Sequence, residues 1–223
     1  MKIITWNVGR PSKRKQQLIS ELLTEQNADI YILTETHAAV KPNLDLEFVS
    51  TITLPAIHDG YSYSPGENRT TIWTKFPVKE IHKTCDPYTC VCADIETPDG
   101  VLTVYGTIIG ILGGNGIGRQ RFKDDFKEQL SDFENLLASK QALIAGDFNV
   151  TFSGRPYPSV HDAQTLRSAF IKAGLINLTE TIPDGIDHIV VSNSFMKDKV
   201  VSITTWNEDK KLSDHIGICI SYR

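Results

Sequence analysis

The first part of the chain alternates apolar and polar segments in a way that predicts a strand, a helix and a second strand. Residues 2–8 form a short β-branched apolar run, which is typical of a buried strand. Residues 14–26 carry one apolar helix face, made by Leu18, Leu22 and Leu23. Residues 29–34 form a second apolar strand. This opening predicts a β–α–β unit whose helix packs outside a sheet.

The remaining pattern predicts many strands and two further helices. Middle strands are expected at 46–53, 70–75, 89–97 and 101–109, and the last two are joined by a Pro98-Asp99-Gly100 turn. A long helix is expected at 119–138, with a buried stripe of Phe122, Phe126, Leu130, Phe133 and Leu137. Later elements are a strand at 141–146, a helix near 162–173 and strands near 187–192, 199–206 and 215–221.

About ten strands and three helices are too many strands for one open sheet covered by helices on both faces. An α/β fold of two packed sheets with helices outside fits this count better. The 223 residues, 40% of them hydrophobic, predict a single domain over 1–223. No apolar run approaches the roughly 20 residues of a membrane helix, so no membrane segment is expected.

Net charge and cysteine content limit the cellular compartment and the binding partners that are expected. A net charge of −4 argues against a broad nucleic-acid-binding surface. Three local basic clusters, at 13–15, 119–123 and 210–211, are expected to be solvated faces. The four cysteines lack zinc-finger spacing and are expected to be reduced thiols in a cytoplasmic protein. The glycines of 113–118 miss the spacing of a dinucleotide-binding loop, which favours a plain flexible loop.

Five apolar strands begin or end in acid, amide or histidine residues. Such strand ends are where α/β proteins place their sites, because a rigid sheet positions groups that a loop would leave mobile. Each residue alone also has a structural explanation: Asp147 could form an Asx turn, Asp214 could cap a turn and His188 could be a core histidine. Trp6-Asn7-Val8 and Phe148-Asn149-Val150 echo each other, so two similar halves could bring both asparagines to one edge.

The polar strand ends, taken in order, resemble the motifs of the endonuclease/exonuclease/phosphatase superfamily, which includes deoxyribonuclease I and exonuclease III. The matching segments are Thr5-Trp6-Asn7-Val8, Leu33-Thr34-Glu35-Thr36, Gly146-Asp147-Phe148-Asn149, Ile186-Asp187-His188-Ile189 and Ser213-Asp214-His215. The resemblance covers residues 3–220 and implies a four-layer α/β/β/α sandwich. It also implies a hydrolase of phosphoester bonds that binds Mg²⁺ or Mn²⁺ through Asn7, Glu35 and Asp214.

The same resemblance implies a role for each of the other motif residues. Asp147 is expected to activate the attacking water and Asn149 to hold the phosphate. Asp187 is expected to orient His215 toward a phosphate oxygen. Tyr105 is the best match to the family's central-strand His or Tyr, although no Asn follows it. Arg119, beside the Gly-rich loop, is a candidate substrate-binding residue, and the roles of His37 and of this loop stay open.

Three functions remain open from the sequence. The first is a nuclease acting on DNA or RNA, which the Trp-Asn and Gly-Asp-Phe-Asn segments favour. The second is a phosphoesterase of a small phosphorylated metabolite or lipid headgroup, which the acidic balance favours. The third is a non-catalytic binding module, which the complete set of polar motif residues disfavours. Substrate, endo- or exo-action and oligomeric state are not determined.

Overall fold

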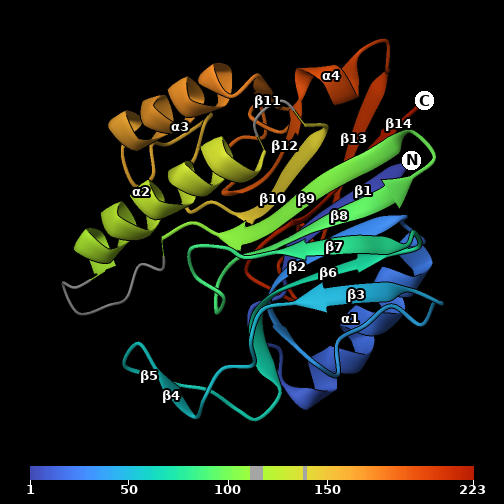
Figure 1. Ribbon diagram of the computed structural model, residues 1–223. Coiled ribbons are helices and arrows are strands. Elements are labelled where there is room, and N and C mark those ends of the chain that lie inside the picture. Colours follow the sequence, from blue (N-terminus) through green and yellow to red (C-terminus); the bar gives the residue numbers. More distant parts are fainter. Residues whose placement is uncertain (111–117, 138–139) are drawn as a thin grey trace.

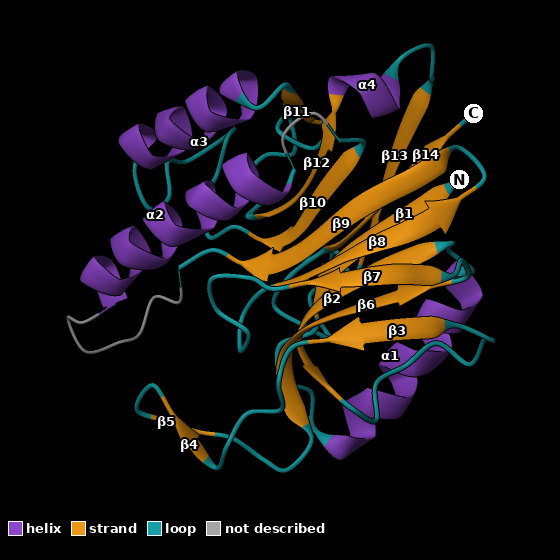
Figure 2. Ribbon diagram, in the orientation of Figure 1, coloured by secondary structure: helices purple, strands orange, loops and turns teal. Residues whose placement is uncertain are grey.

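The computed structural model describes residues 1–110, 118–137 and 140–223, with side chains of the helix that begins at Gly118 described from Phe122 onward. Two large sheets pack face to face with helices on their outer sides (Figures 1 and 2). The predicted four-layer α/β/β/α sandwich is thereby confirmed. The Gly-rich segment 113–118 falls almost wholly outside the described residues.

The first sheet has the strand order β13-β14-β1-β2-β6-β3. Its members are β13 (Val201–Trp206), β14 (Gly217–Tyr222), β1 (Lys2–Asn7), β2 (Ile30–His37), β6 (Glu67–Thr74) and β3 (Glu47–Ser50). Only β1 and β2 pair in parallel, and the other neighbours are antiparallel. The outer face of this sheet is covered by α1 (Lys13–Gln26) through Ile19 and Leu23. Leu18 is 45% exposed, so its predicted place on the buried face is wrong: the stripe follows Ile19 and Leu23, four residues apart.

The second sheet repeats this plan in the order β11-β12-β10-β9-β8-β7. Its members are β11 (Leu175–Asn177), β12 (Asp187–Ser192), β10 (Ala142–Asp147), β9 (Gly100–Ile108), β8 (Val91–Thr97) and β7 (Val78–His82). Here β10 and β9 are the parallel pair. The helices α2 (Gly118–Leu136) and α3 (Val160–Lys172) cover its outer face, and Phe122, Phe126 and Phe133 of α2 are buried there as predicted.

A few short elements were not evident in the hydrophobic pattern: the edge strands β7 and β11, the small pair β4 (Ile57–His58) and β5 (Tyr61–Ser62), and the one-turn helix α4 (Asn193–Met196). The expected hairpin between β8 and β9 is present, with Thr97 paired to Gly100 across Pro98-Asp99. None of the described helices is long and apolar enough to cross a membrane.

The two sheets enclose an apolar core that includes Ile32 and Ile72 from one sheet and Val104 and Ala145 from the other. In each sheet the central strand, β1 or β10, has one parallel and one antiparallel neighbour. The ends of these two strands meet between the layers, where Asn7 contacts Asp147. The core therefore holds the two strand ends that carry the predicted site against each other.

Candidate active site

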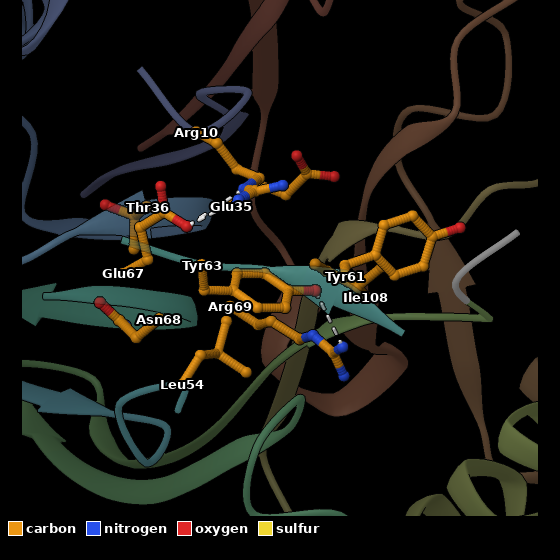
Figure 3. A pocket seen from close by; sticks show the side chains of 10 residues that line it. All are labelled: Arg10, Glu35, Thr36, Leu54, Tyr61, Tyr63, Glu67, Asn68, Arg69 and Ile108. Atoms are coloured by element: carbon orange, nitrogen blue, oxygen red, sulfur yellow. Dashed lines mark hydrogen bonds and ion pairs between the residues drawn. The ribbon is translucent and has the colours of Figure 1, made fainter. Parts of the chain in front are cut away.

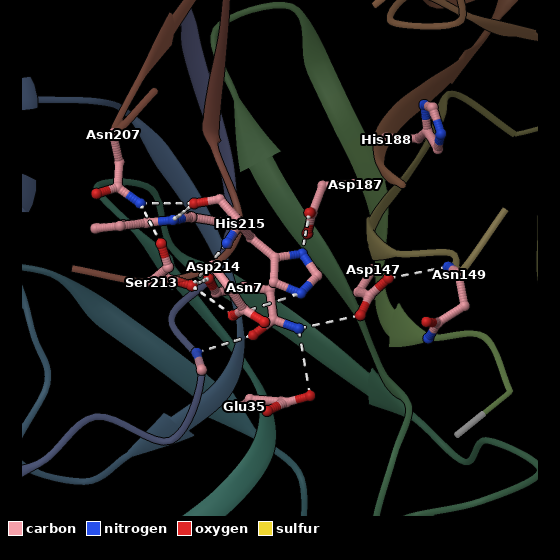
Figure 4. Close-up of polar contacts among 12 residues, drawn as sticks. Asn7, Glu35, Asp147, Asn149, Asp187, His188, Asn207, Ser213, Asp214 and His215 are labelled. Carbon is pink, nitrogen blue, oxygen red and sulfur yellow. Dashed lines mark hydrogen bonds and ion pairs between the residues drawn. The ribbon is translucent and has the colours of Figure 1, made fainter. Parts of the chain in front are cut away.

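Asn7, the last residue of β1, joins two carboxylates that come from different sheets (Figure 4). Its side chain is fully buried, and its Nδ2 lies 3.0 Å from Oδ2 of Asp147 and 3.4 Å from Oε1 of Glu35. Its Oδ1 accepts the backbone N–H of Gly9 at 2.9 Å. In this orientation Asn7 donates to both acids, and binding a metal through Oδ1 requires the amide to turn over and release Gly9. Ligation by Asn7 stays a prediction.

Glu35 occupies a backbone conformation that is uncommon outside glycine, with φ 48°. Side chains of β2 alternate, so that Ile32 faces the opposite sheet and Leu33 faces α1. The ladder with β6 is interrupted at Glu35, between the pairs Thr34–Thr70 and Thr36–Asn68. Positive φ at this point breaks the alternation and lets the carboxylate reach Asn7. Such strain persists only where the surrounding structure enforces it, which is typical of functional positions.

Asp147 ends β10 and accepts a hydrogen bond on each oxygen. Oδ2 accepts from Asn7, and Oδ1 accepts the backbone N–H of Asn149 at 2.9 Å. The Asx turn is therefore present, and it coexists with a contact to the site. Gly146 has φ 138°, and a Cβ there would collide with the carbonyl oxygen of Thr107, so only glycine brings β10 this close to β9. Burial and the nearby charges of Asp187 and Glu35 raise the pKa of Asp147 to about 7.

Asp187 and His215 form the predicted pair. Nδ1 of His215 lies 2.6 Å from Oδ2 of Asp187, which leaves Nε2 toward the open side of the site (Figure 4). Burial lowers the pKa of His215, but the charge and hydrogen bond of Asp187, with the charges of Asp147 and Asp214, outweigh burial and raise it to about 10. The imidazole is therefore a cation at neutral pH and is suited to contact an anionic oxygen.

The loop that carries His215 is held by residues that the sequence analysis did not single out. Nδ2 of Asn207 donates to the carbonyl oxygens of Ser213 and His215 at 2.8 and 2.7 Å. Ser213 Oγ donates to the carbonyl of Asn7 at 2.7 Å and accepts the N–H of His215. Trp206-Asn207 repeats the aromatic–Asn pattern of Trp6-Asn7 at a strand end, and that repetition was an available signal.

The other predicted residues differ in how closely they approach this cluster. Asn149 lies beside it and donates from Nδ2 to the carbonyl of Ile109 at 3.3 Å. The side chain of Asp214 is 85% exposed, and its Oδ1 lies 4.0 Å from Nε2 of His215. Its predicted contact with a metal remains untested. The side chain of Arg119 lies outside the described residues.

Tyr105 does not belong to the site, which corrects the sequence-based prediction. It is fully buried on the helix-facing side of β9, and its hydroxyl donates to Oδ2 of Asp132 at 2.7 Å. The neighbouring positions Val104 and Gly106 point toward the first sheet instead. Because side chains of a strand alternate between its two faces, a tyrosine at position 105 cannot contact substrate at the sheet edge. The sequence did not single out Tyr157, which is 38% exposed and whose pKa is raised by burial and by the charge of Asp147.

His188 is a core histidine, which is the structural explanation that the sequence allowed for it. Its Nε2 lies 3.0 Å from the carbonyl oxygen of Val150 and its Nδ1 3.1 Å from Oγ1 of Thr179. A carbonyl only accepts, so Nε2 carries a proton. Complete burial lowers the pKa of His188 to about 4.

We expect His188 to make the folded state sensitive to acid. Its folded pKa is about 4 against 6.5 when unfolded, so its contribution is complete above pH 6.5 and is lost as pH falls toward 4. The full shift corresponds to about 3 kcal/mol of unfolding free energy. Urea titrations between pH 7.5 and 4 measure this change in the free energy of unfolding. His188→Asn should flatten this part of the profile, whereas His161→Asn, on the exposed side of α3, should not. Equal profiles for the two variants would contradict the assignment.

The residues at the site fit a hard divalent cation. Glu35, Asp147, Asp187 and Asp214 converge there, and the Oδ1 of Asp187 is buried without a hydrogen-bond partner among the described residues. Oxygen donors of this kind suit Mg²⁺ or Mn²⁺. Asp147, Asp187 and His215 also bring possible ligand atoms within 4.8 Å of one another. A protonated imidazole is not a ligand, however, so Glu35 is the better anchor for a cation.

Comparisons with known proteins identify the family and the fold. The model of the Endonuclease/Exonuclease/phosphatase family matches residues 4–215. A 3'-5' exonuclease from Neisseria meningitidis superposes with a TM-score of 0.73 at 16% identity, covering 100% of this chain and 99% of that one. An AP endonuclease from Archaeoglobus fulgidus gives 0.72 at 15% identity, with coverage of 100% and 99%.

The catalytic domain of APE2 from Xenopus laevis gives a TM-score of 0.70 at 13% identity, covering 100% of this chain and 91% of that one. At these identities the solved structures establish a shared fold. No curated protein sequence matches the chain significantly. Since the family match spans nearly its whole length, the chain belongs to the endonuclease/exonuclease/phosphatase family and is a hydrolase of phosphoester bonds.

Proposed function

We propose that the chain is a single catalytic domain that hydrolyses a phosphodiester of nucleic acid with the help of a bound divalent metal. The observation that carries the proposal is the bridge from Glu35 through Asn7 to Asp147, with the Asp187–His215 pair on the other side of Asp147. The fold neighbours that act on nucleic acid support the substrate class. One of these neighbours, a 3' phosphatase from Neisseria, is bound to a product DNA hairpin.

Each side chain has a distinct role in this proposal. Asp147, in its ionised form, accepts the proton of the attacking water, and its fixed position between Asn7 and Asn149 aims it at one point. His215, held by Asp187, presents a protonated Nε2 to a phosphate oxygen, and Asn149 binds the same phosphate. Glu35, with Asn7 and Asp214 nearby, would hold Mg²⁺ or Mn²⁺, which when bound would supply positive charge against the charge of the phosphate. The four free thiols are consistent with a reducing cytoplasm.

A small phosphorylated metabolite or lipid headgroup is the second candidate substrate, and the charge distribution favours it. Among the basic residues near the strand ends, Arg10 pairs with Glu67 at 2.9 Å and Arg69 pairs with Asp59 at 2.5 Å. These two arginines are therefore committed within the protein. Fewer cations are left to hold a polynucleotide than the sequence suggested.

The two candidate functions are distinguished by which substrate is hydrolysed and by how substrate affinity depends on salt concentration. The screen compares bis-p-nitrophenyl phosphate, p-nitrophenyl phosphate, plasmid DNA and RNA, each with Mg²⁺, Mn²⁺ or EDTA. With about two phosphates neutralised, the affinity for duplex DNA should fall with salt at a log–log slope of about −2. Charge reversal at Arg119 and Arg121 should flatten the slope further. Turnover of a small phosphoester that exceeds nucleic-acid turnover, with a slope near zero, would overturn the nuclease proposal.

A further inference from the structure

A pocket opens beside the cluster of candidate catalytic side chains and shares Glu35 with it (Figure 3). Its volume is about 170 Å³, comparable to cavities of about 150 Å³ that hold a benzene ring. It lies between β2, β6, the β4–β5 segment and the end of β9. The lining residues on which the argument rests are Arg10, Glu35, Leu54, Tyr61, Tyr63 and Ile108.

Both arginines that line this pocket are paired with carboxylates of the protein. Arg10 contacts Oε2 of Glu67 through both Nε and Nη2, at 3.2 and 2.9 Å. Arg69 is only 2% exposed and donates to Asp59, Thr89 and Tyr63. Drawing Arg10 away would leave the buried carboxylate of Glu67 without its arginine partner, which is costly, and Arg69 is itself buried among its three acceptors. The pocket therefore does not offer a free cation to a second phosphate.

Instead, the pocket presents a fixed aromatic wall. The guanidinium carbon of Arg10 lies 4.5 Å from the centre of the Tyr63 ring, and Arg69 donates to the Tyr63 hydroxyl at 3.2 Å. These two contacts hold the phenol ring in place. Leu54 is buried at the pocket wall, and Tyr61 and Ile108 complete it. Apolar and aromatic surfaces of this kind suit a planar ring.

The position of the pocket ties its occupant to the phosphate. Glu35 belongs both to the pocket and to the Asn7 bridge. Ile108 immediately precedes Ile109, whose carbonyl accepts from Asn149 and whose N–H donates to the carbonyl of Asp147. A group covalently attached to a phosphate held at Glu35 and Asn149 is thus within reach of the pocket.

We infer that this pocket receives an unpaired nucleobase adjacent to the scissile phosphate, so that the substrate is a strand with a base free to leave the helical stack. The inference rests on the proposed nuclease function and adds its substrate class. Stacking of one base on an aromatic side chain corresponds to roughly five- to hundredfold in affinity. A base inside this pocket cannot remain stacked in a duplex, which makes single-stranded ends or loops the preferred substrates.

The test compares two fluorescein-labelled strands that carry equal numbers of phosphates: a thymidine 15-mer and a 15-mer of abasic tetrahydrofuran units. Binding is measured by anisotropy with Mg²⁺ in the Asp147→Asn variant, so that the result does not depend on hydrolysis. We expect the thymidine strand to bind at least about tenfold more tightly. Leu54→Trp, which fills the pocket, and Tyr61→Ala, which removes an exposed part of its wall, should each reduce this ratio toward one.

Ile57→Trp is the matched control, because Ile57 is 73% exposed on β4 and does not line the pocket. It should leave the ratio unchanged. Circular dichroism establishes that Leu54→Trp is folded, and Tyr61→Ala carries the test if it is not. Equal binding of both strands, or a ratio that neither variant lowers, would overturn the inference. If the thymidine strand binds selectively but the unaltered chain cuts no phosphodiester, the proposed function fails and the pocket assignment stands.

Discussion

Replacing Glu35 with Gln is expected to abolish metal-dependent hydrolysis without unfolding the protein. Its carboxylate anchors the cation in the proposed site, and its only hydrogen bond among the described side chains is the 3.4 Å contact with Asn7. Glutamine has nearly the same shape but no charge, so metal affinity and charge neutralisation are lost while packing is kept. Loss of this electrostatic contribution should lower kcat by at least about a hundredfold.

Initial rates across a Mg²⁺ and Mn²⁺ titration measure the effect, and thermal unfolding in EDTA establishes that the fold is intact. Glu25→Gln, which removes an exposed carboxylate from α1, is the matched control and should leave both rate and metal dependence unchanged. A Glu35→Gln protein with full activity would rule out the metal site proposed here. A variant that melts well below the unaltered chain would show that Glu35 also supports the fold.

The second large effect is expected at the Asp187–His215 pair. His215→Ala removes the cationic contact to the phosphate and should lower kcat by roughly a hundred- to a thousandfold. Asp187→Asn should cost less, because the imidazole stays in place while its orientation and charge are less well held. If the two side chains act as a unit, the double variant loses little more than His215→Ala alone.

A spectroscopic measurement separates orientation from a merely structural role. Removing the Asp187 charge disfavours the imidazolium. The pKa of His215, about 10 in the unaltered chain, should therefore be lower in the Asp187→Asn variant. Titration of the imidazole resonances by NMR measures this shift without substrate. His161→Ala, on the exposed face of α3, serves as the control. Losses that multiply in the double variant, or an unchanged His215 pKa, would show that the two residues work independently.

The hydrophobic pattern alone determined the layers and the order of the site motifs. Apolar strands with helix-period stripes between them require two sheets covered by helices, because each element has one face to bury. The abrupt polar ends of these strands located Asn7, Glu35, Asp147, Asp187 and His215. The short β7, β11 and β4–β5 were missed because strands of two to five residues at sheet edges leave little periodicity to read.

Only the tertiary structure decided which polar residues share the site. Tyr105 lies on the helix-facing side of β9, although it was the best match to the family's central-strand residue. His188 lies in the core, although it directly follows Asp187 in the sequence. Along a strand, neighbouring side chains point to opposite faces of the sheet. Only the packing of the two sheets determines which face contains the site. Likewise, Arg10 and Arg69 are free cations in the sequence and paired ones in the fold, because their acidic partners lie 57 and 10 residues away along the chain.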